Sequence, residues 1–235
     1  MQDRYVGDIG DFSKFSFLNA IAGEDTIGIA WYLFPDEDHN DDGRHVGYLS
    51  DPTLWRDKDP IVFDRLRHLV ETENRSISAV QSHGVLRSAV FSGQRLECDA
   101  LSYRSREKFR TDWFKRVLSD LSDTKIAFAD PDNGLREQEK YKFGNRKNWK
   151  SIPESEVRKL ADSRTAVIYH HNTRRKGGHI AEISYWLERL NADFAVRMRA
   201  NSARSFFVIN AQPEHESRAR AWCAQFGPKF SLVKR

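Results

Sequence analysis

Short apolar runs recur along the chain, and they alternate with segments in which apolar residues return every three or four positions. Runs of strand length without polar alternation are typical of strands buried on both faces, as in a parallel sheet. The clearest such runs are residues 26–34, 125–129 and 165–169. Weaker patterns predict short strands at 5–10 and 76–81.

Helical periodicity fills most of the intervals between these strands. We expect helices at 12–22, 60–73, 105–122, 153–160, 179–191 and 213–226. Near the C-terminus, two apolar runs at 194–198 and 205–210 are separated by about six residues. That interval is too short for a helical crossover, so these two strands should be antiparallel. A final strand is expected at 230–233.

Alternation of strands and helices is typical of a sheet with helices on both faces and right-handed crossovers. The sequence therefore predicts an α/β protein with a Rossmann-like three-layer fold. Its sheet should be mostly parallel and should carry an antiparallel C-terminal hairpin. The length of 235 residues, without a recognisable linker or repeat, favours one domain over residues 1–235.

Composition adds limits on location and partners. The two cysteines, Cys98 and Cys223, form neither a CxxC pair nor a zinc-ligand spacing, which favours free thiols in a reducing compartment. No apolar run approaches the ~20 residues needed to cross a bilayer. We therefore expect a cytoplasmic protein without a membrane partner. A net charge of +4 and a pI near 9.0 permit a polyanionic partner.

Polar and titratable residues follow four of the predicted strands. In open α/β sheets, ligands bind outside the carboxyl ends of the strands. The sequence therefore predicts one site at that edge. The residues concerned are Asp8, Gly10 and Asp11 after the first strand, Asp36 and Glu37 after the second, Asp130, Asp132 and Asn133 after a central one, and His170 and His171 after another.

Two basic segments are candidates for contact with nucleic acid. The polar stretch at 135–151 interleaves cations with aromatic rings, including Arg146, Lys147 and Trp149, and this mixture suits single strands whose bases stack on the rings. The cations Arg174, Arg175 and Lys176 precede a glycine pair and a predicted helix start. A helix N-terminus favours phosphate. Ordinary solvated surface is the alternative for both segments.

Six or seven predicted strands, with the last two as an antiparallel hairpin, resemble the fold of class I S-adenosylmethionine-dependent methyltransferases. The stretch YVGDIGDFS at 5–13 resembles their first motif, and DPDN at 130–133 resembles their fourth. The layout is also similar to that of three-Cys-motif partner proteins, a prokaryotic group. The resemblance implies that S-adenosylmethionine binds at Asp8, Gly10 and Asp11 and, through its ribose, at Asp36 or Glu37, with Asp130 orienting a nucleophile.

Two other functions are compatible with the same residues. Strand-end carboxylates, with Asp130 and Asp132 at their centre, suit Mg²⁺ or Mn²⁺ in a nuclease or phosphodiesterase. Lys14 or His170 would then stabilise charge or move protons. The third alternative is a non-catalytic nucleic-acid-binding module, because a fold does not fix a function. The sequence thus leaves open whether the protein is an enzyme.

Overall fold

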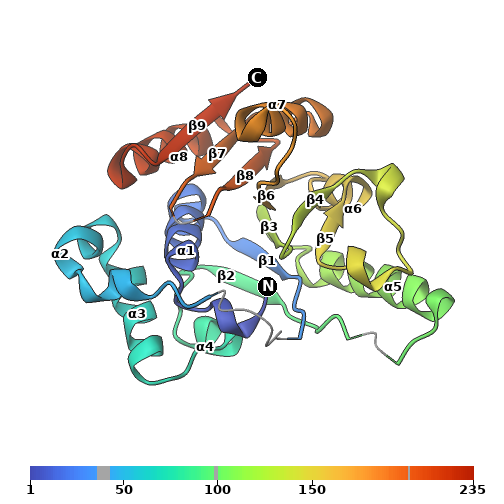
Figure 1. Ribbon diagram of the computed structural model, residues 1–235, viewed down its shortest axis with the longest axis horizontal. Helices are drawn as coiled ribbons and strands as arrows, with labels where there is room; N and C mark the ends of the chain where they lie inside the picture. Colours follow the sequence, from blue (N-terminus) through green and yellow to red (C-terminus); the bar gives the residue numbers. More distant parts are fainter. Residues whose placement is uncertain (36–42, 98–99, 201) are drawn as a thin grey trace.

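The computed structural model describes residues 1–35, 43–97, 100–200 and 202–235. Its main sheet has seven strands in the order β2-β1-β3-β6-β8-β7-β9 (Figure 1). The strands are β1 (Ile27–Trp31), β2 (Ala89–Ser92), β3 (Ile126–Asp130), β6 (Thr165–His171), β7 (Phe194–Met198), β8 (Arg204–Ile209) and β9 (Phe230–Lys234).

The directions of the strands confirm the predicted sheet. β2, β1, β3 and β6 are parallel neighbours. β8 is antiparallel to both β6 and β7, and β9 is antiparallel to β7. Five strands therefore run one way and two run the other, and the antiparallel pairs lie at the C-terminal side of the sheet.

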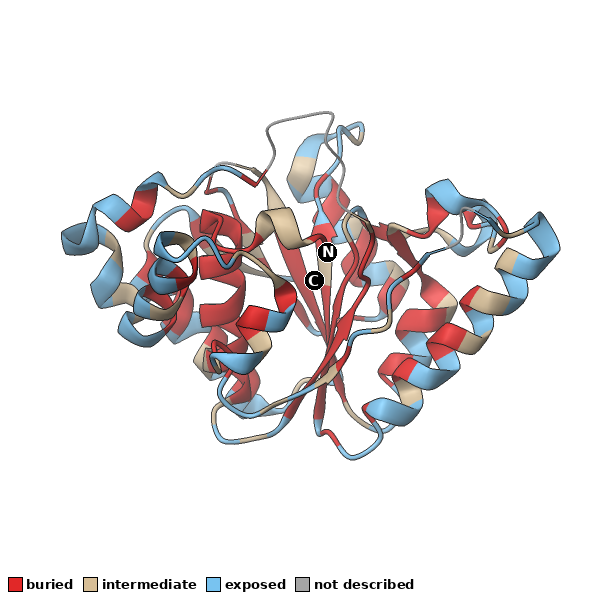
Figure 2. Ribbon diagram, turned by 90° about the horizontal axis from the view of Figure 1, so that it is seen from below, coloured by how far each residue is buried: buried red, intermediate tan, exposed pale blue. Residues whose placement is uncertain are grey.

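Helices cover both faces of this sheet, as Figure 2 shows with the sheet seen between two helical layers. The helices are α1 (Ile9–Ala22), α2 (Pro52–Trp55), α3 (Pro60–Glu71), α4 (Ile77–Ser82), α5 (Tyr103–Asp120), α6 (Glu154–Leu160), α7 (Gly178–Leu190) and α8 (Pro213–Phe226). Side chains of α1, α3, α4 and α8 belong to one apolar cluster and those of α5, α6 and α7 to the other. The three-layer prediction is confirmed.

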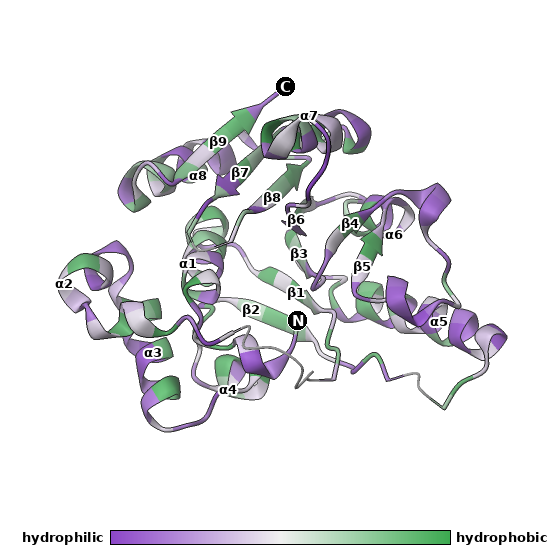
Figure 3. Cartoon of the chain, in the orientation of Figure 1, coloured by the Kyte–Doolittle hydropathy of each residue, from purple (hydrophilic) through white to green (hydrophobic). Residues whose placement is uncertain are grey.

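Alternation along each strand distributes its side chains between these two clusters. In β3, Ile126 and Phe128 join the cluster of α1, whereas Ala127 and Ala129 join that of α5. The strands of the main sheet are mostly hydrophobic, while the outer helices combine hydrophobic and hydrophilic residues (Figure 3). Burial on both faces explains why the strongest strands could be recognised from continuous apolar runs.

A second sheet of two parallel strands, β4 (Gly134–Arg136) and β5 (Ser151–Pro153), lies beside the main one (Figure 1). It is anchored by the fully buried Arg110 of α5, whose Nη2 donates to the carbonyl oxygen of Ser151 in β5 at 3.5 Å and to Oε2 of Glu156 at 2.7 Å. Tyr32 donates to the same oxygen at 2.9 Å. Because a buried charge is costly unless it is paired, this cluster fixes the small sheet against α5 and α6. The polar segment 135–151 therefore has strand residues at both of its ends.

Two predicted strands are wrong. Residues 5–10 contain the end of a short 3-10 helix, Asp3–Tyr5, and the start of α1. Residues 76–81 belong to α4 and its cap. In both places a polar residue caps the helix: Asp8 accepts from the N–H of Gly10, and Ser76 accepts from that of Ala79. A short apolar run is compatible with either a strand or a helix, whereas a capping residue indicates the start of a helix.

Candidate functional site

A cavity of about 390 Å³ opens outside the carboxyl ends of β3 and β6, next to the N-terminus of α1. The chain connects β1 to β2 on one side and β3 to β6 on the other, so the strand order reverses between β1 and β3. The cavity lies near this switch point, where ligands bind in open α/β sheets. Its walls combine acidic, basic and aromatic side chains. The polar ones include Asp8, Asp11, Lys14, His45, Asp130, Asp132, Asn133, Lys150, Tyr169, His171 and Arg204.

A buried cluster of three charges, Asp11, Lys14 and Asp130, lines the cavity. Lys14 Nζ lies 2.8 Å from Asp11 Oδ1 and 2.8 Å from Asp130 Oδ2. Each of the three residues is at most 4% exposed. Helical geometry places Asp11 and Lys14 one turn apart on the same side of α1, and β3 delivers Asp130 to them. With both carboxylates ionised, the cluster carries one excess negative charge.

The carboxyl group of Asp11 is only half satisfied. Its Oδ2 is buried and has no hydrogen-bond partner among the residues that the structure describes. Burial raises the pKa of Asp11 to about 6 against the opposing effect of Lys14, and the negative charges of Asp130 and Asp8 add to the rise. Burial alone would lower the pKa of Lys14, but the two carboxylates outweigh it and raise that pKa. Lys14 is therefore a cation.

Asp132 and Asn133 line the same cavity, and each is held by different contacts. Asp132 Oδ1 lies 2.6 Å from the α-amino nitrogen of Met1, and its Oδ2 accepts from Gln2 Nε2 at 2.7 Å. Burial would raise the pKa of Asp132, but the Met1 amino group, Gln2 and Lys150 together lower it. The backbone N–H of Asn133 donates to the carbonyl oxygen of Lys150 at 2.7 Å, which ties the strand-end segment to the small sheet.

Basic side chains also line the cavity, and they are more exposed than the acidic cluster. They are Lys150 and Arg204, and the imidazoles of His45 and His171 line the cavity as well. The Arg204 guanidinium lies against Gly10, where a Cβ would come within 1.5 Å of its Nη1. Gly10 was predicted to lie at the end of a strand; it lies instead in the first turn of α1, and its missing side chain makes room for Arg204.

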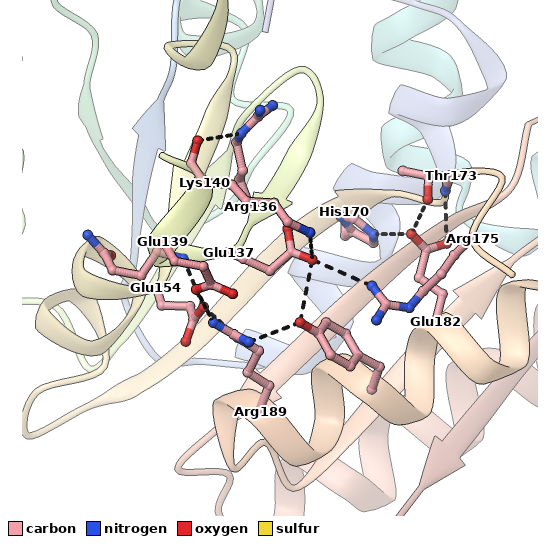
Figure 4. A network of polar contacts seen from close by, with 12 residues as sticks. Arg136, Glu137, Glu139, Lys140, Glu154, His170, Thr173, Arg175, Glu182 and Arg189 are labelled. Carbon is pink, nitrogen blue, oxygen red and sulfur yellow. Dashed lines mark hydrogen bonds and ion pairs between the residues drawn. The ribbon is translucent and has the colours of Figure 1, made fainter. Parts of the chain in front are cut away.

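His170 lies outside the cavity, although the sequence grouped it with His171. Both belong to β6, so their side chains point to opposite faces. His170 is 1% exposed; its Nδ1 accepts from the backbone N–H of Leu135 at 3.0 Å, and its Nε2 lies 3.2 Å from Glu182 Oε1 (Figure 4). Gly134, with φ +79°, packs so closely that a Cβ there would meet His170 Cα at 2.5 Å. His170 therefore packs against Gly134 and Leu135 and supports the segment that follows β3.

Glu182 of α7 completes this support. It accepts from the backbone N–H of Thr173 at 2.8 Å and from the Thr173 hydroxyl at 2.5 Å, besides its contact with His170. Burial would raise the pKa of Glu182, but the hydrogen bonds from His170 and Thr173 outweigh it and lower that pKa to about 2. No local pattern in the sequence singles out Glu182, because only the fold brings its partners to it.

The predicted nucleic-acid residues have mixed outcomes. Trp149 has 0% exposure, so the prediction that its ring stacks on bases is wrong. Arg175 lies 3.5 Å from the centroid of the Tyr185 ring and 3.6 Å from Glu137, which occupies its guanidinium in a surface cluster (Figure 4). The remaining cations are exposed: Arg146, Lys147, Arg174 and Lys176.

Asp36 and Glu37 lie outside the described residues. Within those residues, no three His, Cys, Asp or Glu side chains are placed to hold a metal ion. No described helix has the length and apolar character needed to cross a membrane. A comparison with models of known protein families gives no match, and a comparison with curated protein sequences gives none either.

Sequence reasoning missed several residues of the cavity, among them Tyr169 and Arg204. Arg204 begins β8, an antiparallel strand whose first residue lies at the edge where the parallel strands end. A search for polar residues at the starts of antiparallel strands would have found it. Tyr169 was assigned to the strand core.

Proposed function

We propose that the cavity binds S-adenosylmethionine and that the protein transfers the methyl group to nucleic acid. The observation that carries this proposal is the acidic cluster of Asp11, Lys14 and Asp130 at the carboxyl end of β3. A site in this position is where an α/β sheet of this kind binds its ligand.

The charges of the cavity fit a ligand that carries charges of both signs. Four carboxylates line it, those of Asp8, Asp11, Asp130 and Asp132, and so do four cationic groups, those of Lys14, Lys150, Arg204 and the amino group of Met1. S-Adenosylmethionine carries a sulfonium, an ammonium and a carboxylate group, and each can pair with a group of opposite charge in such a lining.

Size and shape agree with the same ligand. A volume of about 390 Å³ lies within the usual range of roughly 300–1,000 Å³ for small-molecule sites. The rings of Tyr5 and Tyr169 line the cavity and present flat surfaces of the kind that a purine stacks on. The antiparallel β8, inserted between β6 and β7, agrees with the sheet that the methyltransferase resemblance implies.

When bound, S-adenosylmethionine would supply an activated methyl group. Asp8, Asp130 and Asp132 would hold its cationic part by charge. Lys14 holds the buried carboxyl group of Asp130 in position through Oδ2, and from there Asp130 would orient a donor group of the acceptor substrate.

Nucleic acid is the acceptor that the mouth of the cavity supports. Phosphate contacts by cations fix the position of a nucleic acid without reading its sequence. Lys150 and Arg204 line the cavity together with the imidazoles of His45 and His171. The exposed Arg146 lies over the same Phe34 ring as Lys150, and the exposed Lys147 follows it in the chain. Among the described residues, no specific observation favours the metal-dependent alternative.

Isothermal titration calorimetry with S-adenosylmethionine tests the proposal. The wild-type protein should bind it saturably, and Asp130→Asn should bind at least about tenfold more weakly, which corresponds to about 1.4 kcal/mol. Asp123→Asn, an exposed change beyond the other end of β3, is the matched control and should bind like the wild type. The absence of binding heat for the wild type across several temperatures would contradict the proposal.

A further inference from the structure

The unpartnered oxygen of Asp11 has no counterpart in the other acids of the cavity. Asp8 accepts from the N–H of Gly10 at 2.6 Å through Oδ1 and from that of His45 at 3.3 Å through Oδ2. Asp132 uses both of its oxygens on Met1 and Gln2. Asp11 Oδ1 contacts Lys14, but Oδ2 is buried without a partner among the described residues.

A buried carboxylate oxygen without a hydrogen bond is costly, since it has lost water and gained nothing in return. Asp11 lines the cavity, so its carboxyl group adjoins the space that a bound molecule would occupy. A proton-bearing group of a ligand in that space would supply the missing partner of Oδ2.

We infer that Asp11 is the general base of the reaction, and that Oδ2 takes the proton from the attacking group of the acceptor. This inference rests on the proposed methyl transfer. The acceptor nitrogen or oxygen forms a bond to the methyl carbon, the bond between that carbon and sulfur breaks, and its electron pair stays on sulfur as a thioether. The proton released by the acceptor atom ends on Asp11.

The inference narrows the substrate class. An amino or hydroxyl group loses a proton on methylation, so it needs such a base. A ring nitrogen that bears no proton attacks through its lone pair and needs no base. The acceptor is therefore an amino or hydroxyl group of the nucleic acid.

The cluster is built to tolerate this proton. When Asp11 becomes neutral, Lys14 keeps Asp130 as its partner at 2.8 Å, so no buried cation is left unpaired. Burial also raises the pKa of Asp11 to about 6, which leaves the group ionised at neutral pH and basic enough to accept a proton.

The first test needs no substrate. Carbon-13 NMR of the aspartate carboxyl groups, with the Asp11 signal assigned through Asp11→Asn, should show a group titrating near pH 6 in the ligand-free protein. Titration near pH 4 would overturn the inference, because the group would then be an ordinary carboxylate held by Lys14.

The second test separates the inference from the proposed function. Transfer of a labelled methyl group to total RNA and genomic DNA should fall on the order of 10²- to 10⁴-fold in Asp11→Asn. S-Adenosylmethionine affinity should change less than threefold, roughly 0.65 kcal/mol. Asp11→Glu should restore part of the rate, and the wild-type rate should rise as the pH passes 6.

The other possible results distinguish a failure of the proposed function from a failure of the assignment of Asp11 as the base. If Asp11→Asn keeps its rate while the wild type is active, the base is another group and the proposed function stands. If Asp11→Asn loses cofactor affinity in parallel with the rate, Asp11 binds the cofactor and the inference fails. If the wild-type protein transfers no methyl group, the proposed function fails and the inference fails with it, whatever the NMR shows.

Discussion

Lys14 and Asp130 lie 116 positions apart in the chain, yet their side chains meet at 2.8 Å in a buried ion pair. The pair joins the first helix to the end of a central strand, and Asp11 attaches to it from the same helix. A buried charge cluster of this kind costs desolvation energy, and its value to the protein lies in the position it gives to the carboxylates.

Removing the cation should therefore be strongly destabilising. Lys14→Met leaves Asp11 and Asp130 without their shared partner, and we expect a loss of about 3–5 kcal/mol in the free energy of unfolding at pH 7. Urea denaturation measures it. Lys108→Met removes an exposed ion pair with Asp112 and should cost less than about 1 kcal/mol. Equal losses in the free energy of unfolding for the two variants would show that the buried cluster stabilises the protein no more than an exposed ion pair does.

Asp11 should make stability depend on pH in the opposite sense from most acids. Because its pKa is raised from 3.8 to about 6, the stability that it contributes is complete below pH 4 and is lost as the pH rises through 6. Relative to the wild type, Asp11→Asn should be up to about 3 kcal/mol better at pH 8 than at pH 4. Thermal and urea unfolding across this range measure the difference; a constant difference would contradict the account.

Glu182 should behave in the usual sense for a carboxylate. Its pKa is lowered from 4.5 to about 2, so the stability that it contributes is present above pH 4.5 and is lost as the pH falls through 2. Glu182→Gln should cost up to about 3 kcal/mol at pH 7, and the difference from wild type should shrink steadily below pH 4.5. Glu188→Gln, an exposed change on the same helix, should be neutral throughout.

Gly10→Ala should separate folding from ligand binding. Gly10 lies inside α1, where alanine favours the helix by about 1 kcal/mol. Its Cβ would displace only the far end of the flexible Arg204 side chain. Because Arg204 is one of the cations proposed to contact nucleic acid, we therefore expect an unchanged or slightly higher melting temperature and a weaker affinity for a single-stranded oligonucleotide, measured by fluorescence anisotropy. An unaltered affinity would place the oligonucleotide away from Arg204.

The basic surface can be tested without the cofactor. Arg146→Glu combined with Lys147→Glu should weaken binding to a single-stranded oligonucleotide and lower the salt slope by about 0.7 for each phosphate that is no longer neutralised. Fluorescence anisotropy at several salt concentrations measures both. Trp149→Phe is the matched control: its position is buried, so stability should fall while the salt slope stays the same. An unchanged slope in the charge-reversal variant would exclude this surface.

The sequence was a good guide to the sheet wherever a strand is buried on both faces. β3 and β6 carry continuous apolar runs because helices cover each side of them. The sequence-based prediction was wrong at residues 5–10. The apolar pattern there is short, and Asp8 caps and stabilises the start of α1 instead. The prediction that Asp8 and Asp11 share a site with Asp130 nevertheless agrees with the structure for a different reason. α1 precedes β1 and runs against it, so the N-terminus of the helix meets the carboxyl edge of the sheet.

Side-chain direction was harder to predict than position. β6 extends through His170 and His171, two residues beyond the predicted strand, and the alternation that follows places them on opposite faces. Trp149 was interpreted as exposed because cations surround it in the sequence, but the short strands β4 and β5 bury it. Both errors come from contacts between segments far apart in the chain, which local pattern does not contain.

A crystal structure of the protein with S-adenosylhomocysteine, the product left after methyl transfer, tests the central claim most directly. We predict that the ligand lies in the cavity bounded by Asp11, Asp130 and Tyr169, with its sulfur facing the carboxyl end of β3. A ligand bound on another surface, or a cavity that stays empty at saturating concentration, would contradict it.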